Sequence, residues 1–195
     1  MQFAPGTWRL VAVPVLGAVL ALAFSAVWSG VLIALALLVL WFHRDPDRSP
    51  PSTGIVSPAD GRVSVLTRDG DRVRVGVFMN VTDVHVNRSP LSGTLREVEH
   101  VPGAHRPAFA KDSEKNERFH FAFDDHQVTL IAGSFARRIH PHVGAGTTVE
   151  RGDRIGHVSF GSRADVLLPE GVSMDDVRVS KGDRVRAGET VIAAR

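Results

Sequence analysis

The sequence contains no cysteine, no tyrosine and only three lysines among its 195 residues. Without cysteine the chain can form no disulfide, thiolate nucleophile or cysteine-ligated metal site. The net charge is only +2, and no block of arginine and lysine is interleaved with aromatic residues. Both observations argue against nucleic acid as a partner. The chemistry of this protein must therefore be sought in other residue types.

Charge is also missing from a run of 33 residues, Leu10–Phe42. A membrane span needs about 20 apolar residues, so this run is too long for one untilted helix. Ser25, Trp28, Ser29 and Gly30 lie in its middle and favour a break there. The run predicts two short helices.

We expect residues 1–43 to form a membrane-associated helical hairpin whose helices enter and leave the same face of the membrane. Basic residues flank both ends of the run, with Arg9 before it and Arg44 after it. This agrees with both ends lying on the cytoplasmic face of the cell membrane. A single long tilted helix is the alternative. A secretory signal peptide fits less well, because its apolar core spans about 7–15 residues.

The rest of the chain reads as a linker and one domain. Residues 44–53 carry three prolines and predict a linker. Residues 54–195 are enough for one domain with a proper core. Residues alternate between apolar and polar in Arg62–Leu66 and again in Arg72–Phe78, and an Asp-Gly pair typical of a tight hairpin turn separates them.

A second strand pair follows the same pattern. Phe119–Phe123 alternates, Asp124–Asp125 forms a turn, and Gln127–Ile131 is strand-like. The polar segment 108–118 is compatible with a loop or a short helix. The fold class predicted for the domain is therefore mainly β.

Glycine and β-branched residues repeat at an offset of 36 positions near the C-terminal end. The glycines are expected to allow positive φ at turns, and the β-branched residues to pack inward. By itself the repeat predicts a compact β-sandwich, and its spacing resembles the hammerhead β-structure of lipoyl- and biotinyl-carrier domains. The two copies are Val143, Gly146, Val149, Gly152 and Ile155, and Val179, Gly182, Val185, Gly188 and Val191.

Gly161–Ser162 is a dipeptide that can cleave itself. The serine hydroxyl can attack the preceding carbonyl, which glycine leaves unhindered, and convert the amide into an ester. Elimination of that ester gives dehydroalanine, which hydrolyses to a pyruvoyl group. Gly-Ser pairs are common in turns, however, and Gly133–Ser134 is a second one. Only the surrounding sequence separates the two.

That surrounding sequence resembles the short form of phosphatidylserine decarboxylase. The resemblance covers nearly everything from Phe42 to Pro169, with its segments in the same order. The segments are specific in combination rather than singly. They are Ser57–Val63, Asp83–Pro90, Asn116–Arg118, Ile131–Ile139 and the self-cleavage segment Ser159–Pro169.

The resemblance implies a pyruvoyl-dependent carboxy-lyase. Cleavage between Gly161 and Ser162 would leave chains 1–161 and 162–195 as partners of each other, with the pyruvoyl group made from Ser162 as a covalent cofactor and no metal. The substrate would be a membrane phospholipid with a serine headgroup, phosphatidylserine or archaetidylserine. Decarboxylation through a Schiff base would give the ethanolamine lipid. Whether the protein forms a homo-oligomer stays open.

The resemblance also supplies a base and a carboxylate. It assigns catalytic roles to His85 and Asp60, which fits the need for a histidine steered by a carboxylate to activate Ser162. Longer family members carry two histidines three residues apart in this segment. Here His85 takes the first position and Arg88 the second, which leaves two alternatives: His85 serves both steps, or another group assists cleavage.

Two other functions compete with this interpretation. His120, Asp124, His140 and His142 include paired ligands of the kind a zinc hydrolase uses. Only 16 residues separate Asp124 from His140, however, and no further motif supports zinc. The other alternative is a membrane-anchored, lipoyl-like carrier or adaptor without catalysis. None of the three lysines lies in the sequence context that carrier domains have.

Overall fold

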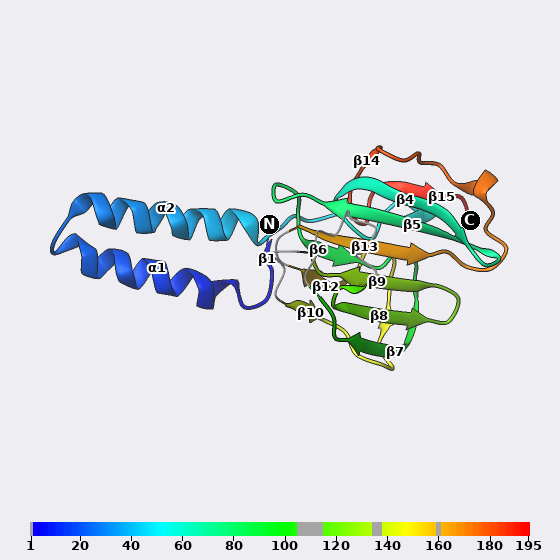
Figure 1. Ribbon diagram of the computed structural model, residues 1–195, viewed down its shortest axis with the longest axis horizontal. Coiled ribbons are helices and arrows are strands. Elements are labelled where there is room, and N and C mark those ends of the chain that lie inside the picture. The colour runs from blue at the N-terminus through cyan, green and yellow to red at the C-terminus, as the bar shows by residue number, and fades with distance from the viewer. Residues whose placement is uncertain (1, 105–114, 134–137, 159–160) are drawn as a thin grey trace. The chain divides into compact units, whose positions relative to one another are not determined.

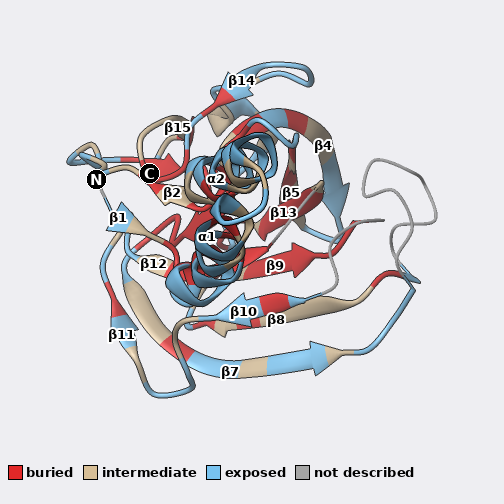
Figure 2. Cartoon of the chain, turned by 90° about the vertical axis from the view of Figure 1, so that its left-hand side faces the viewer, coloured by how far each residue is buried: buried red, intermediate tan, exposed pale blue. Residues whose placement is uncertain are grey.

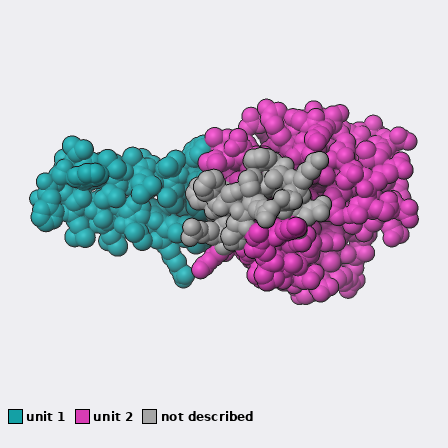
Figure 3. Space-filling view, viewed as in Figure 1, with its two compact units in different colours: residues 1–47 teal, residues 48–195 magenta. Residues whose placement is uncertain are grey.

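The computed structural model describes residues 2–104, 115–133, 138–158 and 161–195. The chain divides into two compact units, residues 1–47 and 48–195 (Figure 3).

The first unit is a helical hairpin. Helix α1 (Thr7–Leu22) packs against helix α2 (Ala26–Phe42), and the short strands β1 (Gln2–Phe3) and β2 (Arg44–Asp45) pair antiparallel at its base (Figure 1). Gly17 leaves room at the helix contact, since a Cβ there would lie 3.3 Å from the Leu32 side chain.

The break in the apolar run is confirmed, and the single long helix is wrong. The break falls at residues 23–25, and Ser25 is the N-cap of α2. Trp28, Ser29 and Gly30 lie inside α2 instead, where the packing of α2 on α1 outweighs their weaker helix preference. Within the described residues, neither helix reaches the combined length and hydropathy of a membrane span. The first two residues of the expected linker form β2.

The second unit is built from strands, which confirms the mainly β class. Its eight-stranded sheet is antiparallel throughout, in the order β11-β7-β8-β9-β13-β5-β4-β14. Two smaller sheets have the orders β10-β12-β6 and β15-β3. The strands are β3 (Ile55–Val56), β4 (Gly61–Asp69), β5 (Arg72–Met79), β6 (Val86–Arg88), β7 (Gly93–Val101), β8 (Arg118–Phe123), β9 (Gln127–Ile131), β10 (Ile139–Pro141), β11 (Thr148–Val149), β12 (Arg154–Val158), β13 (Ser162–Leu167), β14 (Arg184–Val185) and β15 (Val191–Ala193), with a 3₁₀ turn η2 (Met174–Asp176).

The large sheet curls, so that this one curled sheet takes the place of the expected two-sheet sandwich (Figure 2). Fully buried residues of the sheet, such as Leu95, Phe121 and Leu130, belong to one cluster with Ile155 of β12 and Ile192 of β15. The small sheets thereby complete the core. Strand β13 lies between β5 and β9 and is buried over nearly its whole length.

Both hairpins predicted from alternation are confirmed. Strands β4 and β5 meet at Gly70–Asp71, and β8 and β9 meet at the turn before Gln127. Strand β7 was not predicted, because a bulge between Leu95 and Glu97 interrupts the two-residue alternation of apolar and polar side chains. The segment 108–118 lies mostly outside the described residues, although Arg118 begins β8.

Each copy of the repeat contains two glycine turns. Its four glycines all have positive φ, between 73° and 99°, as expected. Val149, Ile155 and Val185 are buried in the core, whereas Val143 and Val179 are half-buried. The likeness to lipoyl-carrier domains stays a prediction.

Candidate active site

Ser162 is the first residue of β13 and is fully buried. Its register partner is Met79, the last residue of β5, and its Oγ lies 3.9 Å from the Met79 sulfur. Gly161 precedes it with φ +62°, a conformation that favours glycine. Among the described residues, no atom lies within 4 Å of the place a Cβ on Gly161 would occupy. The described part of the chain therefore leaves open space beside the Gly161 Cα.

The other neighbouring strand brings two more of the resembling segments to Ser162. Arg163 pairs with Ile131 of β9, so Ala132 lies beside the start of β13. Buried Asn116 donates a hydrogen bond of 2.8 Å from its side chain to the Ala132 carbonyl. This bond explains why a buried asparagine stands before β8, and it fixes the chain on that side of Ser162.

Asp60 lies in the bend before β4. Both of its carboxylate oxygens accept hydrogen bonds from Arg48, at 3.0 and 2.9 Å, and one also accepts the Ala187 backbone N–H at 2.8 Å. Burial raises the pKa of the Asp60 carboxyl above its ordinary value, and the Ala187 bond and the Arg48 charge offset this only in part. The fold thus holds the Asp60 carboxylate in a fixed position, and its partners Arg48 and Ala187 offset part of the energetic cost of burying its charge.

His85 lies just before β6 and is buried. Its ring Nδ1 is 3.0 Å from the Asp83 carbonyl oxygen, which can only accept, so Nδ1 carries the proton. Nε2 of the neutral ring then holds the lone pair that a general base requires. The His85 carbonyl accepts a bond from Val158 N–H, which ties this segment to β12 a few residues before the cleavage segment.

The segments that carry the three predicted site residues meet at the end of β5 around Met79. Ser162 is its register partner, and the side chain of Asn87, two residues after His85, lies 3.5 Å from its sulfur. A Cβ on Gly61, the residue after Asp60, would lie 3.2 Å from the Met79 Cα.

The structure does not connect these residues in a relay. The Asp60 carboxylate bonds to Arg48 and Ala187 rather than to His85, and the Ser162 hydroxyl contacts only sulfur among the described residues. The segments of the site therefore lie close together, but the hydrogen bonds among the described residues do not link Ser162, His85 and Asp60 in a chain.

Arg88 occupies the position of the second family histidine. It is buried, and its Nη1 donates a bond of 2.9 Å to the Gly152 carbonyl. Its side chain also packs near Gly188, where a Cβ would lie 3.0 Å from the Arg88 Cδ. Arg88 thereby joins the corresponding glycine turns of the two repeats, which is a structural contact.

Two residues of the site were missed from the sequence. Arg48 was assigned to a linker, and its sequence neighbourhood gives no sign that it pairs with Asp60. Met79 ends an alternating strand and carries no polar signal of its own. Their roles depend on contacts between distant segments, so only the structure shows them.

The four residues proposed for zinc do not form one site. His142 Nε2 is 2.8 Å from His157 Nδ1, and His140 stacks on His157, whereas His120 bonds to Thr129. Asp124 pairs with Arg96. In the part of the chain that the structure describes, no three histidine or acidic residues are arranged to hold a metal ion.

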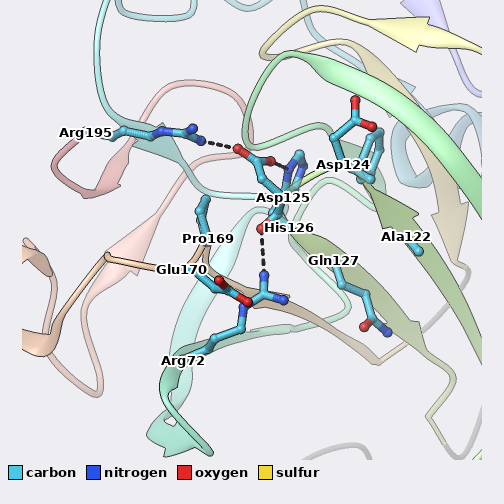
Figure 4. A pocket seen from close by; sticks show the side chains of 10 residues that line it. Arg72, Ala122, Asp124, Asp125, His126, Gln127, Pro169, Glu170 and Arg195 are labelled. Carbon is cyan, nitrogen blue, oxygen red and sulfur yellow. Dashed lines mark hydrogen bonds and ion pairs between the residues drawn. The ribbon is translucent and has the colours of Figure 1, made fainter.

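A pocket of about 350 Å³ lies at the other end of β13 from Ser162. It contains none of the three predicted catalytic residues (Figure 4). Arg195 pairs with Asp125 there, Asp125 accepts from His126, and Arg72 donates to the Asp125 carbonyl. The charges in this pocket are largely paired with one another, so it is a poor candidate for the reaction centre.

The model of the phosphatidylserine decarboxylase family matches residues 35–193 of the chain, which include every predicted site residue. The chain belongs to this family. It is 58% identical over 190 residues to a Halobacterium salinarum protein provisionally named an archaetidylserine decarboxylase proenzyme, a match that covers 97% of each chain.

Bacterial and other archaeal family members are similar over most of their length. A phosphatidylserine decarboxylase proenzyme of Streptomyces avermitilis is 52% identical over 164 residues, covering 82% of this chain and 75% of the relative. A Methanosarcina acetivorans protein, provisionally named an archaetidylserine decarboxylase proenzyme, is 44% identical over 167 residues, covering 83% and 77%.

Family membership confirms the prediction of an enzyme, since the family is one of decarboxylating lyases. The name proenzyme denotes a precursor that is processed. The non-catalytic carrier and the zinc hydrolase are therefore set aside.

Proposed function

We propose that this protein is a self-processing decarboxylase that acts on the serine headgroup of a membrane phospholipid. Its cofactor would be a pyruvoyl group formed from Ser162. The observation that carries the proposal is the placement of Gly161–Ser162: a glycine with left-handed φ precedes a buried serine at the end of the sheet where the family's segments gather.

Self-cleavage would proceed in three balanced steps. The Ser162 Oγ forms a bond to the Gly161 carbonyl carbon, the C–N bond breaks, and the hydroxyl proton passes through a base to the new amine. Loss of the Cα proton then breaks the Cβ–O bond, and Gly161 leaves as a carboxylate. Water finally replaces the nitrogen of dehydroalanine, which departs as ammonia. The products are chains 1–161 and 162–195.

The residues present fit this chemistry. The described residues leave open space beside the Gly161 Cα, and the buried Met79 sulfur is the weak acceptor that the Ser162 hydroxyl meets. A weakly held hydroxyl turns toward a base at little cost. His85, with Nδ1 committed to Asp83, is the candidate base.

In the decarboxylation, the pyruvoyl group supplies a carbonyl that binds the substrate amine and accepts the electrons released with CO₂. The chain's own residues would hold the lipid headgroup and return a proton to its carbon. His85 is the candidate proton donor. Because Arg88 replaces the second family histidine, His85 would serve both cleavage and decarboxylation.

We further propose that the hairpin binds the cell membrane from its cytoplasmic face. Among the described residues, all exposed large apolar side chains except Val81 lie on α1, α2 or the turn between them (Figure 2). A helix that is apolar on all sides requires a non-aqueous environment. At 16 and 17 residues, helices of about 25 Å are shorter than the ~30 Å bilayer core, which favours insertion from one face over crossing.

The base of the hairpin has the composition of a membrane interface. The Arg44 guanidinium lies 4.4 Å from the Trp41 ring centroid, and Trp8 lies near the start of α1. Tryptophan and arginine are enriched at the headgroup level. Such a hairpin would hold the enzyme where a lipid substrate is found.

An activity measurement tests the function directly. Purified protein in mixed vesicles should convert phosphatidylserine or its ether-linked counterpart archaetidylserine to the ethanolamine lipid with release of CO₂, and Ser162→Ala should be inactive. His85→Gln should be slower by roughly 10²–10⁴-fold. The exposed His100 provides the matched control, and His100→Gln should retain wild-type activity.

Offering the two lipids separately identifies the tails that the enzyme accepts. Activity of Ser162→Ala equal to wild type would contradict the pyruvoyl assignment. Failure of processed wild-type protein to release CO₂ from either lipid would contradict the substrate assignment.

A further inference from the structure

Arg48 is the residue that holds Asp60 in place. Its guanidinium contacts both Asp60 oxygens through Nη2, at 2.9 and 3.0 Å, and Glu189 through Nη1, at 3.1 Å. The Arg48 side chain is only 7% exposed and that of Asp60 14%, so water screens this pair little. This is an enclosed ion pair, unlike the solvated pairs that contribute little.

The contact joins three segments that are distant in sequence. Arg48 comes from the proline-rich stretch, Asp60 from the bend before β4, and Ala187 and Glu189 from the turn before β15. The last two lie in the 162–195 piece that self-cleavage would release. Asp60 is therefore held by residues on both sides of the cleavage point.

The other charged groups around Asp60 show why its carboxylate needs Arg48 as a partner. Asp83 is the other acid whose charge acts on Asp60, and Arg184 pairs with Asp83 at 3.3 Å. Glu189 shares Arg48. With two further carboxylates nearby, Asp60 depends on Arg48 as the cation in direct contact with it.

We propose that Arg48 is a positioning residue, which orients the Asp60 carboxylate and keeps it charged for self-cleavage. This inference rests on the proposed function and names a residue for it. Arg48 touches no reacting atom, and it acts through Asp60.

The expected effect follows from the loss of one charge. Burial already raises the pKa of Asp60, and removing the Arg48 charge removes an interaction that lowers it. In Arg48→Ala the carboxyl would bind a proton at higher pH than in the wild type. Self-cleavage would be slower by roughly tenfold or more at mildly acidic pH and would recover as pH rises.

Arg151 provides a matched control. It anchors the same proline-rich stretch through the Ser52 and Gly54 carbonyls, without contacting Asp60. Arg151→Ala should loosen the stretch and leave the pH profile of cleavage where it is. Arg48→Lys keeps the positive charge but loses the two-oxygen contact, so it should restore the profile in part.

The experiment has two readouts. The first is the rate of cleavage against pH for wild type, Arg48→Ala, Arg48→Lys and Arg151→Ala. The second is the carboxyl ¹³C titration of Asp60 in uncleaved Ser162→Ala protein, with and without Arg48→Ala. The proposal expects the profile and the titration to move to higher pH in Arg48→Ala, the profile to move by less in Arg48→Lys, and the profile to stay in place in Arg151→Ala.

Each other outcome is decisive. An unmoved titration overturns the proposal whatever happens to cleavage, and so does an equal shift in Arg151→Ala. A moved titration with an unmoved profile shows that Asp60 does not govern cleavage, which overturns the inference and the role of Asp60 together. If wild type is not cleaved at all, the proposed function fails, and the titration alone decides whether Arg48 keeps Asp60 charged.

Discussion

The states of Asp60 and His85 depend on the groups that form hydrogen bonds with them. Asp60 precedes a glycine and by sequence reads as a turn residue, yet its three hydrogen bonds come from Arg48 and Ala187. His85 is set in one tautomer by the Asp83 carbonyl. Sequence resemblance assigned both to the site, but it could not show that Arg48 holds the carboxylate, because that contact joins the proline-rich stretch to a bend that follows β3.

His126 provides a pH test at the residue scale. Burial lowers the pKa of its ring, and the hydrogen bond that the ring donates to Asp125 offsets this only partly. The unfolded chain takes up this proton below about pH 6.5, whereas the folded protein does not until lower pH. The unfolding free energy should therefore fall as pH drops from 7.5 to 5.5.

His126→Gln should flatten this dependence, as followed by thermal unfolding at the two pH values. Asp125→Asn is the control, since it leaves a buried imidazole that still titrates only in the unfolded chain. An unchanged slope in His126→Gln would show that other groups, such as His120, account for the acid sensitivity.

At the scale of elements, the alternation of apolar and polar residues predicted strands that bury one face. Alternation predicted β4, β5 and β8, the strand-like residues Gln127–Ile131 predicted β9, and the turns fall at Asp-Gly and Asp-Asp. Strand β7 was not predicted, because a bulge between Leu95 and Glu97 interrupts its alternation. The curl of the sheet was not predicted either. It arises from register shifts such as the one between Val63 and Val65, and such shifts leave no pattern in the sequence.

Gly61 tests the tight approach of β4 to β5. It has φ +141°, and a Cβ there would collide with the Phe78 carbonyl. Gly61→Ala should lower the unfolding free energy by roughly 3 kcal/mol, through strain and overpacking. Gly70→Ala, at φ +61° with open space around it, should cost about 1 kcal/mol.

Both glycine variants are compared by denaturant unfolding in the Ser162→Ala background, where every molecule is one chain. Equal losses at the two positions would mean that the strands separate easily at Gly61. The end of β5 that positions Ser162 would then be less rigid than described.

The helical hairpin carries a membrane prediction. Leu16 and Leu38 are 65% and 56% exposed, and a lysine at each would place charge on an apolar face. The double variant Leu16→Lys, Leu38→Lys should lose most of its flotation with phospholipid vesicles. Val81→Lys, at an exposed apolar residue outside the hairpin, should float like wild type. Undiminished flotation of the double variant would contradict membrane binding by the hairpin.

At the scale of the whole molecule, the position of β13 decides what cleavage does to the fold. The strand keeps its hydrogen bonds to β5 and β9, and the same piece also pairs through β14 with β4 and through β15 with β3. Cleavage before Ser162 breaks one covalent bond at the start of this strand. We therefore expect the two pieces to stay together.

Size-exclusion chromatography in mild detergent checks this. Chains 1–161 and 162–195 should elute as one species and separate only in denaturant. Separation without denaturant would show that the sheet does not survive processing. The resemblance implied two chains, but only the strand order shows why they should remain bound.

The most direct test of the account is the intact mass and N-terminal analysis of the purified protein, beside Ser162→Ala and Ser134→Ala. Ser134 lies in the second Gly-Ser pair, outside the described residues, and serves as a control on sequence grounds. Wild type and Ser134→Ala should both give chains 1–161 and 162–195, the smaller blocked by pyruvoyl, and Ser162→Ala should remain whole. Cleavage after Gly133, or an intact wild-type chain in active membranes, would contradict the assignment of Ser162.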